Sequence, residues 1–117
     1  AVPAPIVRQQ EGAKVGLISL GGCDGAVREA VDALRAEGIV VDYMRICGFP
    51  FDDDVDAFIN AHEKNFVIEQ NRDAQLKTLL IAETSVSKER LDSILVYGGF
   101  PLSSQHVVKG LKTKLGA

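Results

Sequence analysis

Short apolar runs alternate with segments of helical spacing along the chain, and this alternation restricts the possible folds more than any other feature. Residues 15–20, "VGLISL", form a continuous apolar run that ends at two glycines, as expected of a strand buried on both faces. Further strands are predicted at 39–46, 66–68 and 94–97. The predicted helices carry apolar residues at helical spacing, namely Val27, Ala30, Val31 and Leu34, then Val55, Phe58 and Ile59, then Leu76, Leu79 and Leu80, and finally Val107, Val108, Leu111 and Leu115. The alternation predicts an α/β fold with right-handed crossovers and a mostly parallel sheet covered on both faces.

The residues between these segments favour the same fold. Asp24 is a candidate N-cap for the first helix, and Gly38 is placed to end that helix in a left-handed turn. Ser103 or Ser104 can cap the last helix. The early segment "PIVRQQEGAKVG" can add a short strand and a turn at 11–12.

A length of 117 residues is typical of one domain with one core. We therefore predict a single domain over residues 1–117, in which 1–5 form a linker and 6–115 form the folded unit. Pro3 and Pro5 suggest the linker, and the chain begins without methionine. Together these features indicate a fragment of a longer subunit.

The composition argues against several classes of partner. The formal net charge is -3, and basic residues cluster only in the last predicted helix, so nucleic acid is not an expected partner. No apolar run approaches the roughly 20 residues that cross a bilayer, and the start "AVPAPIVRQQ" lacks the regions of a secretion signal. We expect a cytoplasmic protein that binds neither nucleic acid nor membrane.

The residues that usually carry chemistry form no familiar arrangement. Cys23 and Cys47 make no Cys-x-x-Cys pair, and neither His62 nor His106 neighbours a cysteine or carboxylate in a nucleophile or metal pattern. His62 is expected at a helix end, near the negative pole of the helix dipole. The serines lack a Gly-x-Ser-x-Gly elbow. We therefore expect no catalytic residue, no metal site and no cofactor-binding residue in this chain.

Two alternatives remain open at the turns that follow the first two strands. Residues 21–25, "GGCDG", form a glycine-rich turn between a strand and a helix, where a nucleotide or flavin phosphate could bind backbone N–H groups. The spacing is not Gly-x-Gly-x-x-Gly, and Asp42, a candidate ribose ligand, sits inside the second strand. Cys23 and Cys47 would follow adjacent strands, so a redox pair is the other alternative.

Residues 52–63, "DDDVDAFINAHE", imitate a calcium-binding loop. Carboxylates stand at relative positions 1, 3, 5 and 12, but Ala57 occupies the position that requires glycine. Val55, Phe58 and Ile59 instead fit a helix that runs through the segment, with acidic residues favoured at its start. We predict a helix there and no calcium site.

The polar run from Glu69 to Asp73 follows a strand that should be buried. Asn71 or Asp73 can cap the next helix, whereas the Glu69 carboxylate needs a partner such as Arg72 or a set of backbone donors. Two interpretations stay open: a polar surface that faces another domain or subunit, and an internal capping network.

The chain resembles a known family at this segment. "FVIEQNRDAQLKTLL", with its Glu69-x-Asn71-x-x-x-Gln75-Leu76 pattern, the helix "AVREAVDALRAEG" and the turn "GGFP" are similar to the C-terminal domain of the α subunit of 2-oxoacid:ferredoxin oxidoreductases, particularly the 2-oxoglutarate type. The resemblance runs from about residue 3 to 115. The chain departs from the family in Cys23 and Asp24, where Ser or Thr followed by Thr is more usual, and in Ala74, where Gly is usual.

The resemblance implies a three-layer α/β/α fold similar to the transketolase C-terminal domain, with five strands of which the first, at 6–10, is antiparallel to the others. It implies a non-catalytic structural and docking domain, inactive alone, whose parent enzyme uses thiamine diphosphate, Mg²⁺, an iron–sulfur cluster and coenzyme A held elsewhere. The implied partners are the N-terminal domain of the same subunit, the β subunit and, through the complex, ferredoxin. The candidate interdomain contacts are Glu69, Asn71, Arg72, Asp73, Gln75, Gly98, Gly99, Phe100 and Pro101.

Overall fold

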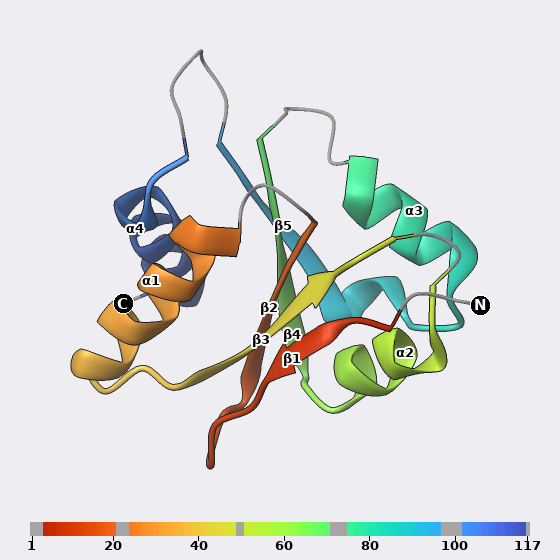
Figure 1. Cartoon of the computed structure of the whole chain (residues 1–117), viewed down its shortest axis with the longest axis horizontal. Helices are drawn as coiled ribbons and strands as arrows, with labels where there is room; N and C mark the ends of the chain where they lie inside the picture. Colours follow the sequence, from red (N-terminus) through yellow and green to blue (C-terminus); the bar gives the residue numbers. More distant parts are fainter. Residues whose placement is uncertain (1–3, 21–23, 49–50, 71–74, 97–101, 117) are drawn as a thin grey trace.

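A five-stranded sheet lies between two pairs of helices in the computed structural model of the chain (Figure 1). The structure describes residues 4–20, 24–48, 51–70, 75–96 and 102–116. The strands are β1 (Ile6–Arg8), β2 (Val15–Leu20), β3 (Val41–Ile46), β4 (Lys64–Glu69) and β5 (Leu91–Leu95). The helices are α1 (Asp24–Ala36), α2 (Asp53–Asn60), α3 (Gln75–Glu83), α4 (Ser104–Leu115) and the short 3-10 helix η2 (Lys88–Arg90).

The strand order is β1-β3-β2-β4-β5, and every neighbouring pair is parallel except β1 with β3. β1 runs antiparallel to β3, with Ile6 opposite Arg45. The three-layer fold, the mostly parallel five-stranded sheet and the antiparallel edge strand are therefore confirmed. The predicted first strand at 6–10 is shorter than expected and ends at Arg8.

Each face of the sheet has its own apolar core. Successive side chains of a strand point to opposite faces, so Leu17 of β2 packs with α1 and α4, whereas Ile18 packs with α2 and α3. Figure 1 shows the sheet nearly edge-on, with α1 and α4 on its left and α2 and α3 on its right. Since both faces are covered, β2 reads in sequence as a continuous apolar run.

Two leucines depart from the helix pattern predicted by the sequence. Leu79 of α3 is 38% exposed and Leu115 of α4 is 40% exposed, whereas Leu76, Leu80, Val107 and Leu111 are buried. Helical spacing places Leu79 beside the buried stripe but does not reveal how far the neighbouring elements extend over it. Leu79 is therefore free to belong to an interaction surface.

The last strand also begins earlier than the apolar pattern indicates. β5 starts at Leu91, which is buried, and the predicted strand at 94–97 overlaps it only at residues 94–95. Asp92 and Ser93 interrupt the apolar run in the sequence. Both side chains are only partly buried because β5 lies at the edge of the sheet.

The turn and cap predictions hold at most positions. Gly12 and Gly38 have φ of 82° and 83°, in the region that favours glycine. Ser103 caps α4 by accepting a hydrogen bond from the His106 N–H, as part of a capping box. Asp24 differs from the prediction, because it is the first residue of α1 and its carboxylate binds Tyr43.

The segment that imitates a calcium loop is helical, as predicted. Asp52 is the N-cap of α2, and its side chain accepts a hydrogen bond from the Asp54 N–H. Val55, Phe58 and Ile59 are buried against the sheet. Within the described ranges, no helix combines the length and the apolar character needed to span a bilayer.

Candidate functional site

A hollow of about 370 Å³ opens at the carboxyl end of the sheet, between β2, β4 and α3. Leu20 ends β2, Glu69 ends β4, and Gln75, Leu76 and Leu79 come from the first turns of α3. In the sheet, β3 lies on one side of β2 and β4 lies on its other side. The hollow therefore lies where the strand order reverses, between β2 and β4. In open α/β sheets this position commonly binds ligands or partners.

The rim of the hollow is apolar and amide-bearing. Leu20 is 48% exposed and Leu79 is 38% exposed, and the side chains of Gln70 and Gln75 are also exposed. Large apolar side chains that share one exposed concave site, with uncharged polar groups beside them, are typical of protein contact surfaces. The geometry therefore suits docking of another polypeptide.

Glu69 supports this surface from beneath. Its side chain is 5% exposed, and it accepts hydrogen bonds from the backbone N–H groups of Leu76 (2.6 Å) and Lys77 (3.3 Å). These donors belong to the first turn of α3 and have no partner within the helix. The carboxylate thus neutralises the positive end of the helix dipole and fixes α3 to the end of β4. The sequence offered Arg72 or a set of backbone donors as partners for the Glu69 carboxylate. In the described residues, its partners are backbone donors.

Glu69→Ala is expected to lower the free energy of unfolding by about 1–2 kcal/mol, because the first turn of α3 would lose the acceptor of two N–H groups. Urea denaturation measures the loss, and amide exchange should become faster at Leu76 and Lys77. Glu69→Gln retains one acceptor oxygen and should lose less. Unchanged exchange at these two amides in Glu69→Ala would show that the cap does not hold the helix.

The structure brings together only part of the predicted contact set. Glu69 and Gln75 both line the hollow. The remaining predicted contacts, Asn71, Arg72, Asp73, Gly98, Gly99, Phe100 and Pro101, lie outside the described residues. Leu20 and Leu79 were missed by sequence reasoning, since both were assigned to buried elements.

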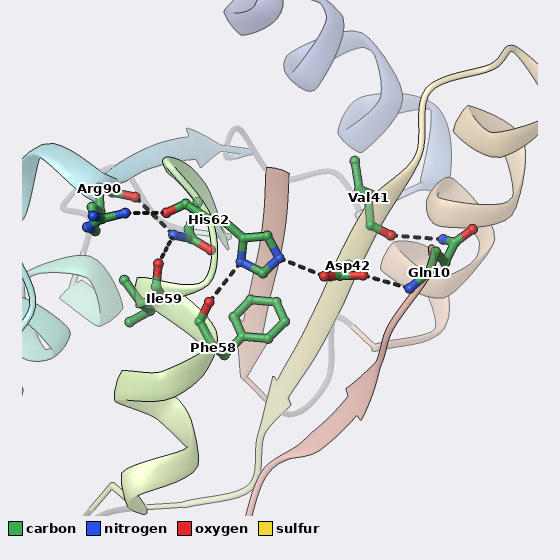
Figure 2. Close-up of polar contacts among 8 residues, drawn as sticks. Gln10, Val41, Asp42, Phe58, Ile59, His62 and Arg90 are labelled. Carbon is green, nitrogen blue, oxygen red and sulfur yellow. Dashed lines mark hydrogen bonds and ion pairs between the residues drawn. The ribbon is translucent and has the colours of Figure 1, made fainter. Parts of the chain in front are cut away.

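A second polar cluster lies on the α2 face of the sheet, toward its amino end (Figure 2). The Asp42 carboxylate accepts from the Gln10 N–H at 2.7 Å and is 2.7 Å from Nε2 of His62. Nδ1 of His62 is 2.8 Å from the Phe58 carbonyl oxygen, which only accepts, so Nδ1 carries a hydrogen. His62 is 2% exposed and follows the end of α2, as predicted.

The cluster continues across the sheet to β4 and the 3-10 helix η2. The Asn65 amide donates to the Ile59 carbonyl at 2.9 Å and to the Arg90 carbonyl at 3.2 Å, while Arg90 donates to the His62 carbonyl at 2.8 Å (Figure 2). Gly16 of β2 lies between Asp42 of β3 and Asn65 of β4 in the strand register. Because glycine has no Cβ, the His62 ring can pack directly against the backbone of β2 at this position.

A histidine beside an aspartate can form the basic part of a catalytic triad, but this pair has no free position for substrate. Both ring nitrogens of His62 are occupied, and the ring packs on Phe58 with centroids 4.7 Å apart. A general base must reach the proton that it abstracts. Asp42, predicted by one alternative to bind ribose, is instead buried in this cluster, which ties β1, β3 and α2 together.

A third polar group joins β2, β3 and α1. The Tyr43 hydroxyl donates to Asp24 at 2.7 Å and lies 2.5 Å from the Ser19 hydroxyl. Burial raises the pKa of the Tyr43 phenol well above its ordinary value, so the phenol keeps its hydrogen. Arg45 lies 3.9 Å from Asp24. The group holds the start of α1 against the sheet.

The described residues contain a complete site neither for the Cys23–Cys47 redox pair nor for a nucleotide or flavin at residues 21–25. Cys47 is a free, exposed thiol, but Cys23 lies outside them. Of the glycine-rich turn at 21–25, only Asp24 and Gly25 are described, and both belong to α1. No group of three or more His, Cys, Asp or Glu side chains in the described ranges could hold a metal ion.

Comparison with known proteins identifies the relatives of this chain. No protein-family model matches it. Over 102 residues, 86% of the chain, it is 33% identical to 2-oxoacid:ferredoxin oxidoreductase 2, subunit alpha, of Aeropyrum pernix. The chain is homologous to part of a 2-oxoacid:ferredoxin oxidoreductase α subunit. The homologous segment covers 16% of that relative, so this α-subunit homologue spans about a sixth of its length.

Several solved structures share the fold of this chain. The 2-oxoglutarate:ferredoxin oxidoreductase of Magnetococcus marinus, solved with 2-oxoglutarate, coenzyme A and succinyl-CoA, is 34% identical with a TM-score of 0.84, over 97% of this chain and 20% of that one. Two further structures are 19% identical to this chain and share the fold alone. One is the α chain of a probable 2-oxoacid ferredoxin oxidoreductase from Thermoplasma acidophilum, with a TM-score of 0.64 over 97% of this chain and 98% of that one. The other is a split-gene transketolase, with a TM-score of 0.67 over 91% of this chain and 39% of that one.

Proposed function

We propose that this chain is a non-catalytic structural and docking domain of a thiamine diphosphate-dependent 2-oxoacid:ferredoxin oxidoreductase, with 2-oxoglutarate as the substrate. Such an enzyme oxidatively decarboxylates a 2-oxoacid to an acyl-CoA and reduces ferredoxin. The observation that carries the docking role is the hollow at the carboxyl end of the sheet, with Leu20 and Leu79 exposed beside Gln70 and Gln75. The matched segment is 16% of the related α subunit, which supports the presence of neighbouring polypeptide.

The two exposed leucines give the docking role its physical basis. Covering a fully exposed leucine side chain contributes roughly 1.5–3 kcal/mol, and Leu20 and Leu79, which are 48% and 38% exposed, would each contribute part of that. Leu20 ends β2, and Leu79 lies on α3, which the Glu69 cap fixes to the end of β4. The proposed partners are the N-terminal domain of the same subunit and the β subunit. Ferredoxin would meet the enzyme through the complex, in the cytoplasm.

The residues described around the carboxyl-end hollow do not fit thiamine diphosphate. A diphosphate needs N–H donors or positive charge, but the Leu76 and Lys77 N–H groups already bind Glu69. Besides the Glu69 carboxylate, the polar side chains that line the described part of the hollow are the Gln70 and Gln75 amides, which carry no positive charge. We therefore assign thiamine diphosphate, Mg²⁺, the iron–sulfur cluster and coenzyme A to the rest of the enzyme.

Leu79→Glu is expected to weaken association of this domain with the rest of the oxidoreductase by about tenfold or more, because a charge would replace an apolar contact at the interface. The substitution would be made in the complete enzyme. Light scattering after size exclusion measures assembly, and 2-oxoglutarate-dependent ferredoxin reduction measures activity. Activity should fall in proportion to the assembled fraction.

Leu115→Glu is the matched control, because Leu115 is 40% exposed on α4, away from the hollow. It should leave both assembly and activity unchanged. Equal losses of assembly in the two variants would contradict docking through the hollow. Turnover of 2-oxoglutarate by the 117-residue chain alone would contradict the non-catalytic role.

A further inference from the structure

A second and larger hollow runs along the outer side of β5. It has a volume of about 820 Å³ and lies between β5, the C-terminal helix α4 and Lys77 of α3. β5 is the last strand in the sheet order, and β4 is its only neighbour among the described strands. A strand edge of this kind can accept an added strand.

The hydrogen-bonding groups of β5 alternate between β4 and the open side. The Val96 N–H donates to the Glu69 carbonyl oxygen of β4 at 2.8 Å, so Ile94, two residues earlier, also directs its amide groups to β4. Ser93 and Leu95 therefore direct their N–H and C=O groups to the open side. Ser93 lines the hollow, and its hydroxyl is buried without a hydrogen-bond partner in the described part of the chain.

Part of this edge is protected by a side chain. The Asp92 carboxylate accepts from the Ser93 N–H at 2.8 Å and lies 3.5 Å from Nζ of Lys114. Partial burial acts in the opposite direction, but the Ser93 N–H and Lys114 together hold the pKa of Asp92 below its ordinary value. The carbonyl of Ser93 and both backbone groups of Leu95 are thus the positions that an added strand would pair with.

The charge around the edge is positive, although the whole chain is negative. Among the described residues that line the hollow, Lys77, Lys109 and Lys114 stand against the single carboxylate of Asp92, while the formal net charge of the chain is -3. A second copy of this edge would bring the same lysines together, and like charges disfavour that pairing. An extended segment with acidic side chains would place its charges beside lysines instead.

We propose that the open edge of β5 binds an extended acidic peptide segment of a partner polypeptide as an additional strand. Backbone hydrogen bonds to Ser93 and Leu95 would set its register, and its acidic side chains, on every second residue, would lie on the α4 face of the sheet beside Lys109. This surface is distinct from the carboxyl-end hollow, and the proposal does not depend on the enzyme to which the chain belongs.

The test uses the 117-residue chain and a short fluorescent peptide that alternates glutamate with valine. Anisotropy should show saturable binding about tenfold tighter than binding of the same peptide with lysine in place of glutamate. Methylating every backbone nitrogen of the acidic peptide should abolish binding, because neither edge of the extended peptide then has N–H groups to donate. Equal binding of the methylated peptide would overturn the proposal in favour of charge attraction alone.

A charge reversal locates the site. Lys109→Glu should weaken binding of the acidic peptide about tenfold, whereas Lys14→Glu, at an exposed lysine that does not line the hollow, should leave it nearly unchanged. Equal effects of the two variants would overturn the proposal. A chain that dimerises in light scattering and loses peptide binding as it does so would assign this edge to a second copy instead.

Discussion

Gly16→Ala is expected to lower the free energy of unfolding by about 3–5 kcal/mol, which is a large part of the stability of a small domain. An added Cβ would lie 2.3 Å from Oδ1 of Asn65, 2.7 Å from Cε1 of Phe58 and 3.0 Å from Nδ1 of His62. These atoms cannot move away cheaply, because the Asn65 amide and the His62 ring are hydrogen-bonded on the far side. Alanine has a better intrinsic preference for a strand by roughly 0.5–1 kcal/mol, which is too small to compensate.

Urea denaturation of the purified chain measures this loss. Gly25→Ala is the matched control, since Gly25 lies in α1 and nothing lies within 4 Å of an added Cβ there. That variant should be neutral or more stable by up to about 1 kcal/mol, because alanine favours a helix. A Gly16→Ala protein within about 1 kcal/mol of the parent would mean that the polar cluster can rearrange, contrary to the close packing described above.

His62→Ala is expected to cost about 3–5 kcal/mol of stability, because it removes the partner of a buried carboxylate and opens a cavity beside Phe58. Asp42 would keep the Gln10 N–H but lose the His62 ring nitrogen at 2.7 Å. Pairing the change with Asp42→Ala in a double-mutant cycle separates the two causes. The double variant should lose clearly less than the sum of the single losses, since the unpaired charge is absent.

His106→Ala is the control for loss of an imidazole. His106 is exposed and takes part in the cap of α4, so its removal should cost only about 0.5–1 kcal/mol. If His62→Ala were no more costly than His106→Ala, the buried cluster would not contribute to stability in the way that its hydrogen bonds indicate.

The fold could be predicted well from the sequence, because the central strands are mostly apolar and alternate with segments of helical spacing. β2 and the helix α1 that follows it are marked by "VGLISL" and by Val27, Ala30, Val31 and Leu34. β5 was placed less well, because an edge strand carries polar residues such as Asp92 and Ser93. The exposure of Leu79 and Leu115 depends on how far neighbouring elements extend, which helical spacing does not encode.

The polar sites were predicted only in part. Glu69 was identified as a carboxylate that needs partners, and backbone donors were one of the options considered, since a buried charge must be paired. The partnership of Asp42 with His62 was missed because the two are 20 residues apart, although an aspartate inside an apolar strand signals that some partner exists. Gly16 carried no signal, because its role arises only once Asn65, Phe58 and His62 come together around it.

The position of β1 has a consequence for the order in which the domain forms during synthesis. Residues 6–8 leave the ribosome before the rest of the sheet, yet their partners are residues 43–45. Gln10 follows β1, and its N–H donates to Asp42. The hydrogen bonds of Asp42 are complete only when His62 has also left the ribosome. The first-made strand must therefore wait, unpaired, until β3 has been made, and its Gln10–Asp42 contact is completed by His62 only after α2 has followed. A pause in translation before β3 is made would leave the backbone groups of residues 6–8 without their strand partners and available to chaperones.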